Sequence, residues 1–171
     1  PNLSYVINNG DITLVWNLAD LDQISGFNLY GNTPNEGWGL VNSFDMDIST
    51  FTLSDQGVPA YFNLSSKISS EEYTEGFKSD SYGVYNSKQL KKILIVDGFD
   101  RTNGSYPFPY HSFAMTMGQA ISPWGYSFDT IDNDELLPGN IFLEDYEAVF
   151  WFLGDESTYN ETFNDFEQDL V

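Results

Sequence analysis

The chain has 171 residues, of which 41% are hydrophobic and 17% aromatic, so it can bury the core of one large or two small domains and is not disordered. Its 26 acidic and 6 basic residues give a formal charge of −20, which argues against binding to nucleic acid or to anionic membranes, because both need a basic surface. The chain has no cysteine, which excludes disulfides, thiolate metal sites and cysteine nucleophiles.

The sequence contains no apolar run of the roughly 18 residues needed to cross a membrane, so no span is predicted. The residues from Pro1 onward lack the basic and apolar regions of a signal peptide. We therefore expect a mature or excised fragment.

Residues 1–86 have the pattern of an all-β unit. Apolar residues alternate with polar ones in short segments, and turn residues such as the Asn-Gly pair at 9–10 separate them. This pattern predicts a β-sandwich. The expected strands are 3–7, 12–16, 24–30, 40–44, 50–53, 59–64 and 76–85.

The aromatic residues of this unit have two possible roles. We predict that Trp16, Phe27, Tyr30 and Tyr61 are core residues, since buried aromatics dominate such cores, although an exposed platform for sugar rings is an alternative. Trp38, between two glycines in EGWGL, is the better candidate for such a platform. The competing hypothesis for Trp38 is that it covers a hairpin.

The same residues carry a family resemblance. Trp16 in the second strand, ISGFNLY at 24–30, the strand around Tyr61 and EGFKSDSYGVY at 75–85 resemble a fibronectin type III domain. The resemblance covers nearly all of residues 1–86 and implies that the tryptophan and the late tyrosine pack between two sheets. YFNLSSKIS at 61–69 departs from the valine-rich strand that is usual there.

After a short linker at 87–90, residues 91–171 change to continuous apolar runs. Such runs at 93–96 and 147–153 predict strands that are buried on both faces, parallel and adjacent, and the two most buried of the unit. Helices are expected at 110–121 and 162–171, and a short strand at 124–129. The order predicts the opening of a doubly wound α/β sheet with too few strands to be complete, so we expect a truncated chain or a partner that completes the sheet.

Acidic residues follow both apolar strands and form the candidate site. Asp97 and Asp100 follow the first strand, and Asp155 and Glu156 follow the second, so the two loops could meet at one sheet edge. With Arg101 nearby, the four carboxylates could bind Ca²⁺ or Mg²⁺, or act as an acid–base pair, or only cap helices and loop amides. Ser157 and His111 could assist, but no spacing links them into a triad, and His111 alone cannot form the usual zinc site.

The second half also resembles a known domain. DGFDR (97–101), GYSFDTIDNDE (125–135), the strand within 143–153, GDEST (154–158) and FEQDLV (166–171) are similar to secreted bacterial proteins labelled xanthan-lyase-like or N-acetylmuramoyl-alanine-amidase-like. In those proteins a fibronectin type III domain precedes a flavodoxin-like domain that resembles class I glutamine amidotransferases. The resemblance implies a carbohydrate or cell-envelope context and an extracellular, periplasmic or cell-surface location.

The expected fold class is therefore a fibronectin type III sandwich (1–86) followed by an incomplete flavodoxin-like α/β domain (91–171). The leading functional hypothesis is a non-catalytic protein that binds carbohydrate or another envelope component, or takes part in envelope assembly. One alternative is a fragment of a polysaccharide lyase or cell-wall amidase whose remaining active site lies beyond Val171. The other is a subunit of an extracellular filament or surface layer, in which a neighbouring copy completes the sheet.

Overall fold

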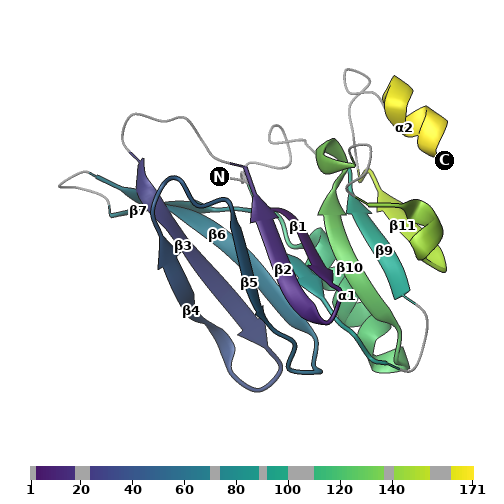
Figure 1. The fold of residues 1–171 in the computed structure, drawn as a ribbon, viewed down its shortest axis with the longest axis horizontal. Helices are drawn as coiled ribbons and strands as arrows, with labels where there is room; N and C mark the ends of the chain where they lie inside the picture. Colours follow the sequence, from purple (N-terminus) through teal and green to yellow (C-terminus); the bar gives the residue numbers. More distant parts are fainter. Residues whose placement is uncertain are drawn as a thin grey trace.

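The fold is taken from a computed structural model, which describes residues 3–17, 24–69, 74–88, 92–99, 110–136, 141–154 and 163–171. Within these residues the strands form two sheets (Figure 1). Sheet A has six strands in the order β11-β9-β10-β1-β2-β5. Its strands are β1 (Leu3–Asn8), β2 (Asp11–Trp16), β5 (Thr50–Ser54), β9 (Lys92–Asp97), β10 (Ser127–Asp132) and β11 (Ala148–Phe152).

Sheet B has five strands, with β4-β3-β6-β7 in order and β8 paired to β6. They are β3 (Ile24–Thr33), β4 (Gly37–Phe44), β6 (Ala60–Ile68), β7 (Glu75–Lys78) and β8 (Tyr82–Val84). The helical elements are α1 (Phe113–Ile121), α2 (Asp165–Leu170) and the 3₁₀ turns η1 (Ser122–Trp124), η2 (Asn133–Glu135) and η3 (Leu143–Asp145). With nine and six residues, α1 and α2 are both far too short to cross a bilayer, which needs about 20 apolar residues.

The alternation of apolar and polar residues in the first half of the chain directs the apolar side chains into a core between the two sheets. Val6 and Leu14 from sheet A and Phe27, Leu29 and Leu64 from sheet B are fully buried in one cluster. Trp16 lies in the same cluster and packs against Phe44, with ring centroids 5.2 Å apart. The core role predicted for Trp16 and Phe27 is thus confirmed.

The predicted fold class is wrong, because no separate flavodoxin-like α/β domain is formed. Strands β9, β10 and β11 are parallel to one another, but β10 also pairs antiparallel with β1, with Tyr5 opposite Ile131. The parallel strands are therefore one end of a mixed sheet that includes the first strands of the chain. The division at 87–90 stays a prediction, since a shared sheet does not by itself say which parts fold independently.

The continuous apolar run of β9 is explained by burial of both faces of the strand, each in a different hydrophobic cluster. Ile93 and Ile95 face the core between the sheets, together with Ala114 of α1. Leu94 and Val96 face a second, smaller cluster on the opposite side of sheet A. That cluster is completed by Ile131, Leu136 and Ile141, so turns as well as helices cover this face. The pattern correctly predicts burial on both faces but does not specify what covers them.

The two predicted parallel neighbours, β9 and β11, are confirmed, with Ile95 opposite Phe150. The prediction that both are the most buried strands is wrong for β11, which is half-buried and exposes Phe150. The reason is its position at the edge of sheet A. Strand β10, at the centre of the sheet, is buried instead.

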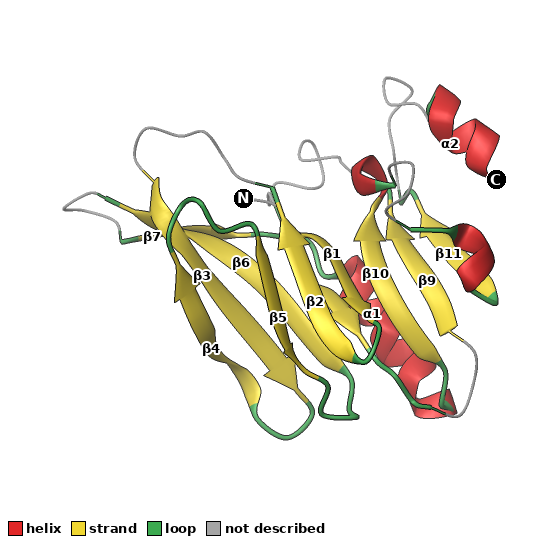
Figure 2. Cartoon of the chain, in the orientation of Figure 1, coloured by secondary structure: helices red, strands yellow, loops and turns green. Residues whose placement is uncertain are grey.

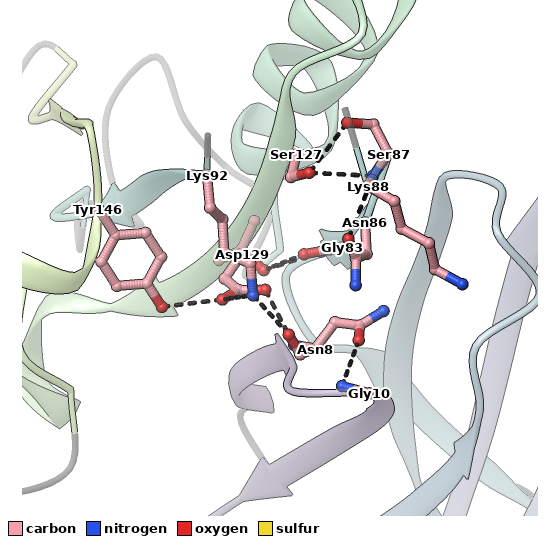
Figure 3. Close-up of polar contacts among 11 residues, drawn as sticks. Asn8, Gly10, Gly83, Asn86, Ser87, Lys88, Lys92, Ser127, Asp129 and Tyr146 are labelled. Carbon is pink, nitrogen blue, oxygen red and sulfur yellow. Dashed lines mark hydrogen bonds and ion pairs between the residues drawn. The ribbon is translucent and has the colours of Figure 1, made fainter. Parts of the chain in front are cut away.

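A buried ion pair joins the two halves of sheet A (Figure 3). Asp129 on β10 is 1% exposed, and its Oδ2 lies 2.9 Å from the Lys92 ammonium. The Tyr146 hydroxyl donates to the same oxygen at 2.8 Å, and the Asn8 amide donates to Oδ1 at 2.9 Å. Lys92 also donates to the Asn8 carbonyl. Burial raises the pKa of Asp129, whereas Lys92 and the three hydrogen bonds act in the opposite direction.

A second set of bonds connects sheet B to β10 (Figure 3). The Thr130 hydroxyl accepts from the Gly83 amide at 2.9 Å and donates to the Gly83 carbonyl at 2.8 Å. Tyr85 and Phe128 exchange two backbone hydrogen bonds of 2.8 and 2.9 Å. Strand β8 and Tyr85, which follows it, thus connect sheet B to β10 of sheet A.

Helix α1 lies behind sheet A in the view of Figure 2 and packs closely on it. Gly118 has no side chain, and a Cβ there would lie 2.6 Å from the Phe128 ring and 3.1 Å from Tyr61. Tyr61 stacks on Phe128 with centroids 6.1 Å apart. This burial of Tyr61 raises its pKa to about 12. Tyr61 is thus a core residue as predicted, and it is buried by Phe128 of the opposite sheet together with α1.

We predict that Lys92→Met destabilises the protein more at pH 7 than at pH 4. Without the ammonium, the folded-state pKa of Asp129 rises further above its unfolded value. A raised carboxyl pKa contributes stability that is present below the unfolded pKa and is lost as the pH rises through the folded pKa. Loss of one partner of a buried pair costs about 3–5 kcal/mol, and we expect about 2–4 at pH 7 because Lys92 keeps 21% exposure.

Urea unfolding of parent and variant at both pH values measures this difference. Lys67→Met removes the same charge from a residue that makes no ion pair within the described part of the chain, and it should change the free energy of unfolding by less than about 0.5 kcal/mol. An equal loss at the two pH values would show that Asp129 is not the group left uncompensated.

We also predict that Gly118→Ala lowers the melting temperature, although alanine favours helices by about 1 kcal/mol. The new Cβ would overlap the fully buried Phe128 ring, and such overpacking costs about 1–3 kcal/mol. Gln119→Ala, on the exposed face of the same helix, is the control and should have little effect. Thermal unfolding by circular dichroism gives both values, and a stabilised Gly118→Ala would contradict the close packing.

Candidate functional site

Of the acidic residues of the predicted site, Asp97 is the one that lies within the described residues. This residue is buried at the end of β9, and its Oδ1 accepts a hydrogen bond of 3.2 Å from the Phe99 amide. The loop-amide role that we considered for Asp97 is therefore observed. Asp100, Arg101, Asp155, Glu156 and Ser157 lie outside the described residues, so their convergence stays a prediction. No cluster of three or more histidine and acidic side chains suited to a metal occurs in the described ranges.

His111 lies two residues before α1, which begins at Phe113 and not at 110 as predicted. Its ring stacks on Phe113 with centroids 5.0 Å apart, and its Nδ1 lies 3.6 Å from an Asp80 oxygen. Its amide donates to the Asp80 carboxylate, and its carbonyl accepts from the Ser81 amide at 2.9 Å. Burial lowers the pKa of His111, so the imidazole is neutral at pH 7. These bonds fix the start of α1 against the chain just before β8.

Trp38 lies on β4 with 41% of its surface exposed, opposite Asn32 of β3. The alternation of the neighbouring strand β3 determines which residues lie on the same face of sheet B as Trp38. In β3, Phe27 and Leu29 face the core while Asn28 and Tyr30 face outward, and outward Tyr30 pairs with Asn63 of β6. The core role predicted for Tyr30 is wrong, because its place in the alternation, and not its aromatic character, decides the face it occupies.

An open groove of about 410 Å³ lies between this outer face of sheet B and the start of α1. We call it the sheet B groove. It combines aromatic and apolar side chains with a few polar groups. Its lining residues are Trp38, Asn63, Lys78, Ser81, Tyr110, His111, Ser112, Phe113 and Met115.

Lys78 is held in the groove by aromatic rings. Its ammonium lies 4.1 Å from the Tyr30 ring centroid and 5.7 Å from that of Trp38, which places it in cation–π contact with Tyr30. No ion pair within 4.0 Å links it to any described carboxylate. The charge of Lys78 is thus positioned without being neutralised by a direct partner.

Glu75 is beside the groove and is already well bonded. Its Oε1 accepts from the Tyr30 hydroxyl at 2.7 Å, from Asn28 Nδ2 at 3.0 Å and from the Ser65 hydroxyl. Burial alone would raise the pKa of Glu75, but these hydrogen bonds and the Lys78 charge outweigh it and lower the pKa. Glu75 is therefore ionised at neutral pH and fixes the orientation of the Tyr30 ring.

Asn63 lies at the bottom of the groove with only 4% exposure. Its Nδ2 donates to the Ser81 hydroxyl at 3.2 Å, and its Oδ1 has no hydrogen-bond partner among the described residues. Whichever way the amide is turned, one of its two ends is left without a partner. A buried polar group in this state costs about 1–3 kcal/mol.

The sequence pattern points to Trp38 as a site residue but not to Lys78, Asn63 or Tyr110. Neither strand carries a clear signal, because β6 is buried at seven consecutive positions including Asn63, and in β7 the apolar Phe77 is more exposed than Lys78. Tyr110 gives no signal either, because the groove depends on the start of α1 lying beside sheet B, and these elements are distant in the sequence. The groove suits non-covalent binding of a ligand with both apolar faces and polar edges.

Comparison with known proteins gives limited information. No family model matches the chain, and neither does any curated protein. Among solved structures, it is similar to the spore cortex lytic enzyme SleM of Clostridium perfringens, with 13% identity, a TM-score of 0.38, and coverage of 50% of this chain and 27% of that one. Pectate lyase PelI from Erwinia chrysanthemi has 15% identity, a TM-score of 0.40, and coverage of 56% and 32%.

An Fn3-like protein from Clostridium thermocellum has 19% identity and a TM-score of 0.37, with coverage of 47% of this chain and 82% of that one. The chain thus spans about a third or less of the lytic enzyme and the lyase. At these identities and TM-scores the similarities give no basis for a shared activity.

Proposed function

We propose that the protein binds carbohydrate without cleaving it, and that the sheet B groove is its binding site. The observation that carries this proposal is the exposed Trp38 indole in an open groove that also contains Tyr110, Lys78 and the buried Asn63 amide. A sugar ring has apolar C–H faces and hydroxyl groups at its edge. Trp and Tyr side chains offer an apolar face beside a polar tip, which suits such a ligand.

The described groups favour binding over hydrolysis. Glycoside cleavage usually needs two facing carboxyl groups, one of which has a raised pKa and acts as the acid. Glu75 has a lowered pKa and its Oε1 already accepts three hydrogen bonds, so it is a poor proton donor. His111 is neutral and stacked on Phe113, which suits a wall of the groove better than proton transfer.

An extracellular, periplasmic or cell-surface location belongs to the same proposal, and the resemblance of the sequence to secreted bacterial proteins supports it. The enzyme-fragment and filament hypotheses depend on residues or neighbours outside the groove. No contact within the described ranges favours either of them.

We predict that Trp38→Ala weakens carbohydrate binding at least about tenfold, because loss of a central aromatic contact costs more than about 1 kcal/mol. Affinity is measured by calorimetry on the best ligands from an array of plant, algal and bacterial cell-wall glycans. The control is Trp124→Ala, which removes a 78% exposed tryptophan on η1, away from the groove, and should leave affinity unchanged. Equal binding by the two variants, or no binding to any glycan, would contradict the proposal.

A further inference from the structure

We propose that the sheet B groove selects acidic sugars and that Lys78 is the residue that pairs with the sugar carboxylate. This inference rests on the proposed carbohydrate-binding function and adds the class of ligand. The carboxylate could belong to a uronic acid or to the lactyl ether of a muramic acid. Both present one negative charge at the edge of a pyranose ring.

The first support is how Lys78 is held. A lysine in a strongly acidic chain would ordinarily be neutralised by a carboxylate, as Lys92 is by Asp129. Lys78 instead lies against the Tyr30 ring, and Glu75 orients that ring through the 2.7 Å hydrogen bond from its hydroxyl. Contact with a ring face attracts the ammonium but leaves its N–H donors available. The groove therefore presents a positioned cation without a direct anionic partner among the described residues.

The second support is where the cation lies relative to the stacking surface. The Lys78 ammonium lies over the Trp38 ring, 5.7 Å from its centroid. A pyranose that contacts the exposed part of the indole would have a substituent of its ring edge near Lys78. Asn63 and Ser81 are at the bottom of the same groove, where they can bond ring hydroxyls. One sugar residue can thus contact the indole and the ammonium together.

The net charge of −20 opposes an anionic ligand at long range, and this sets the conditions of the test. Charges farther apart than about 8 Å are largely screened at 0.15 M salt. Nearby Glu75 and Asp80 are hydrogen-bonded to Tyr30 and to His111, which spreads their charge. Selection by Lys78 should therefore be measured near 0.15 M salt and on short oligosaccharides, where local contacts dominate.

The experiment uses two pairs of matched ligands at 0.15 M NaCl. One pair is trigalacturonate and its carboxyl-reduced form. The other is a peptide-free muroglycan tetrasaccharide and its carboxyl-reduced form. We expect the parent protein to bind at least one acidic ligand about tenfold more tightly than its neutral partner, and the better pair identifies the source of the carboxylate.

Variants assign this preference to one side chain. Lys78→Met should abolish the preference while the affinity for the neutral ligand changes less than about twofold, and Lys78→Arg should retain it. Lys67→Met removes an equal charge from the same sheet outside the groove and should keep the full preference. Far-ultraviolet circular dichroism checks that each variant is folded.

The possible failures are distinguishable. If the parent binds acidic and reduced ligands equally, or if Lys78→Met keeps the preference, the inference about acidic sugars is overturned while carbohydrate binding stands. If no ligand of either pair and no glycan on the array binds, both the inference and the proposed function are overturned.

Discussion

The buried carboxylate of Asp129 is the constraint on which the rest of this structure depends. Its partners come from three places that are distant in the sequence: Asn8 on β1, Lys92 on β9 and Tyr146 after η3. A carboxylate with 1% exposure is tolerated only if each of its oxygens is bonded and its charge is matched, so these segments must meet in one register. The ion pair adds little net stability by itself. Its effect is to specify that β10 lies between β1 and β9, which joins antiparallel and parallel strands in one sheet.

The position of β10 determines the groove on the far side of the molecule. Phe128 is one residue before Asp129, and it packs on Gly118 of α1 and stacks on Tyr61 of β6. The start of α1 is also bonded to the chain before β8, through Asp80 and Ser81. One wall of the groove therefore comes from a helix that follows β9, while the opposite wall belongs to sheet B. The sheet B groove exists only when both halves of the chain are folded together, although no residue of the Asp129 network lines it.

The strands could be predicted from the sequence where the pattern that indicates them lies within one short segment of the chain. Alternation predicted the strands around Trp16 and Phe27, and the apolar run at 93–96 predicted a strand buried on both faces that pairs in parallel with β11. The pairing of β10 with β1 was not predictable, because Asn8 and Asp129 are 121 positions apart and neither position carries a local signal for the other. The same reason explains the wrong fold class. Tyr30 shows a different error, since residue type was allowed to override the alternation that places it outward.

The charge state of the groove follows from contacts and not from the composition of the chain. Hydrogen bonds and Lys78 lower the pKa of Glu75 below its ordinary 4.5, against the effect of burial, and burial lowers the pKa of His111 below 6.5. Glu75 is therefore anionic and His111 neutral at all pH values above 6.5. Among the described residues no carboxylate lies within 4.0 Å of the Lys78 ammonium, and the Tyr30 ring lies beside it instead. Because Glu75 is bonded to Tyr30 and not to Lys78, this acid orients the ring that contacts the cation and makes no ion pair with the ammonium.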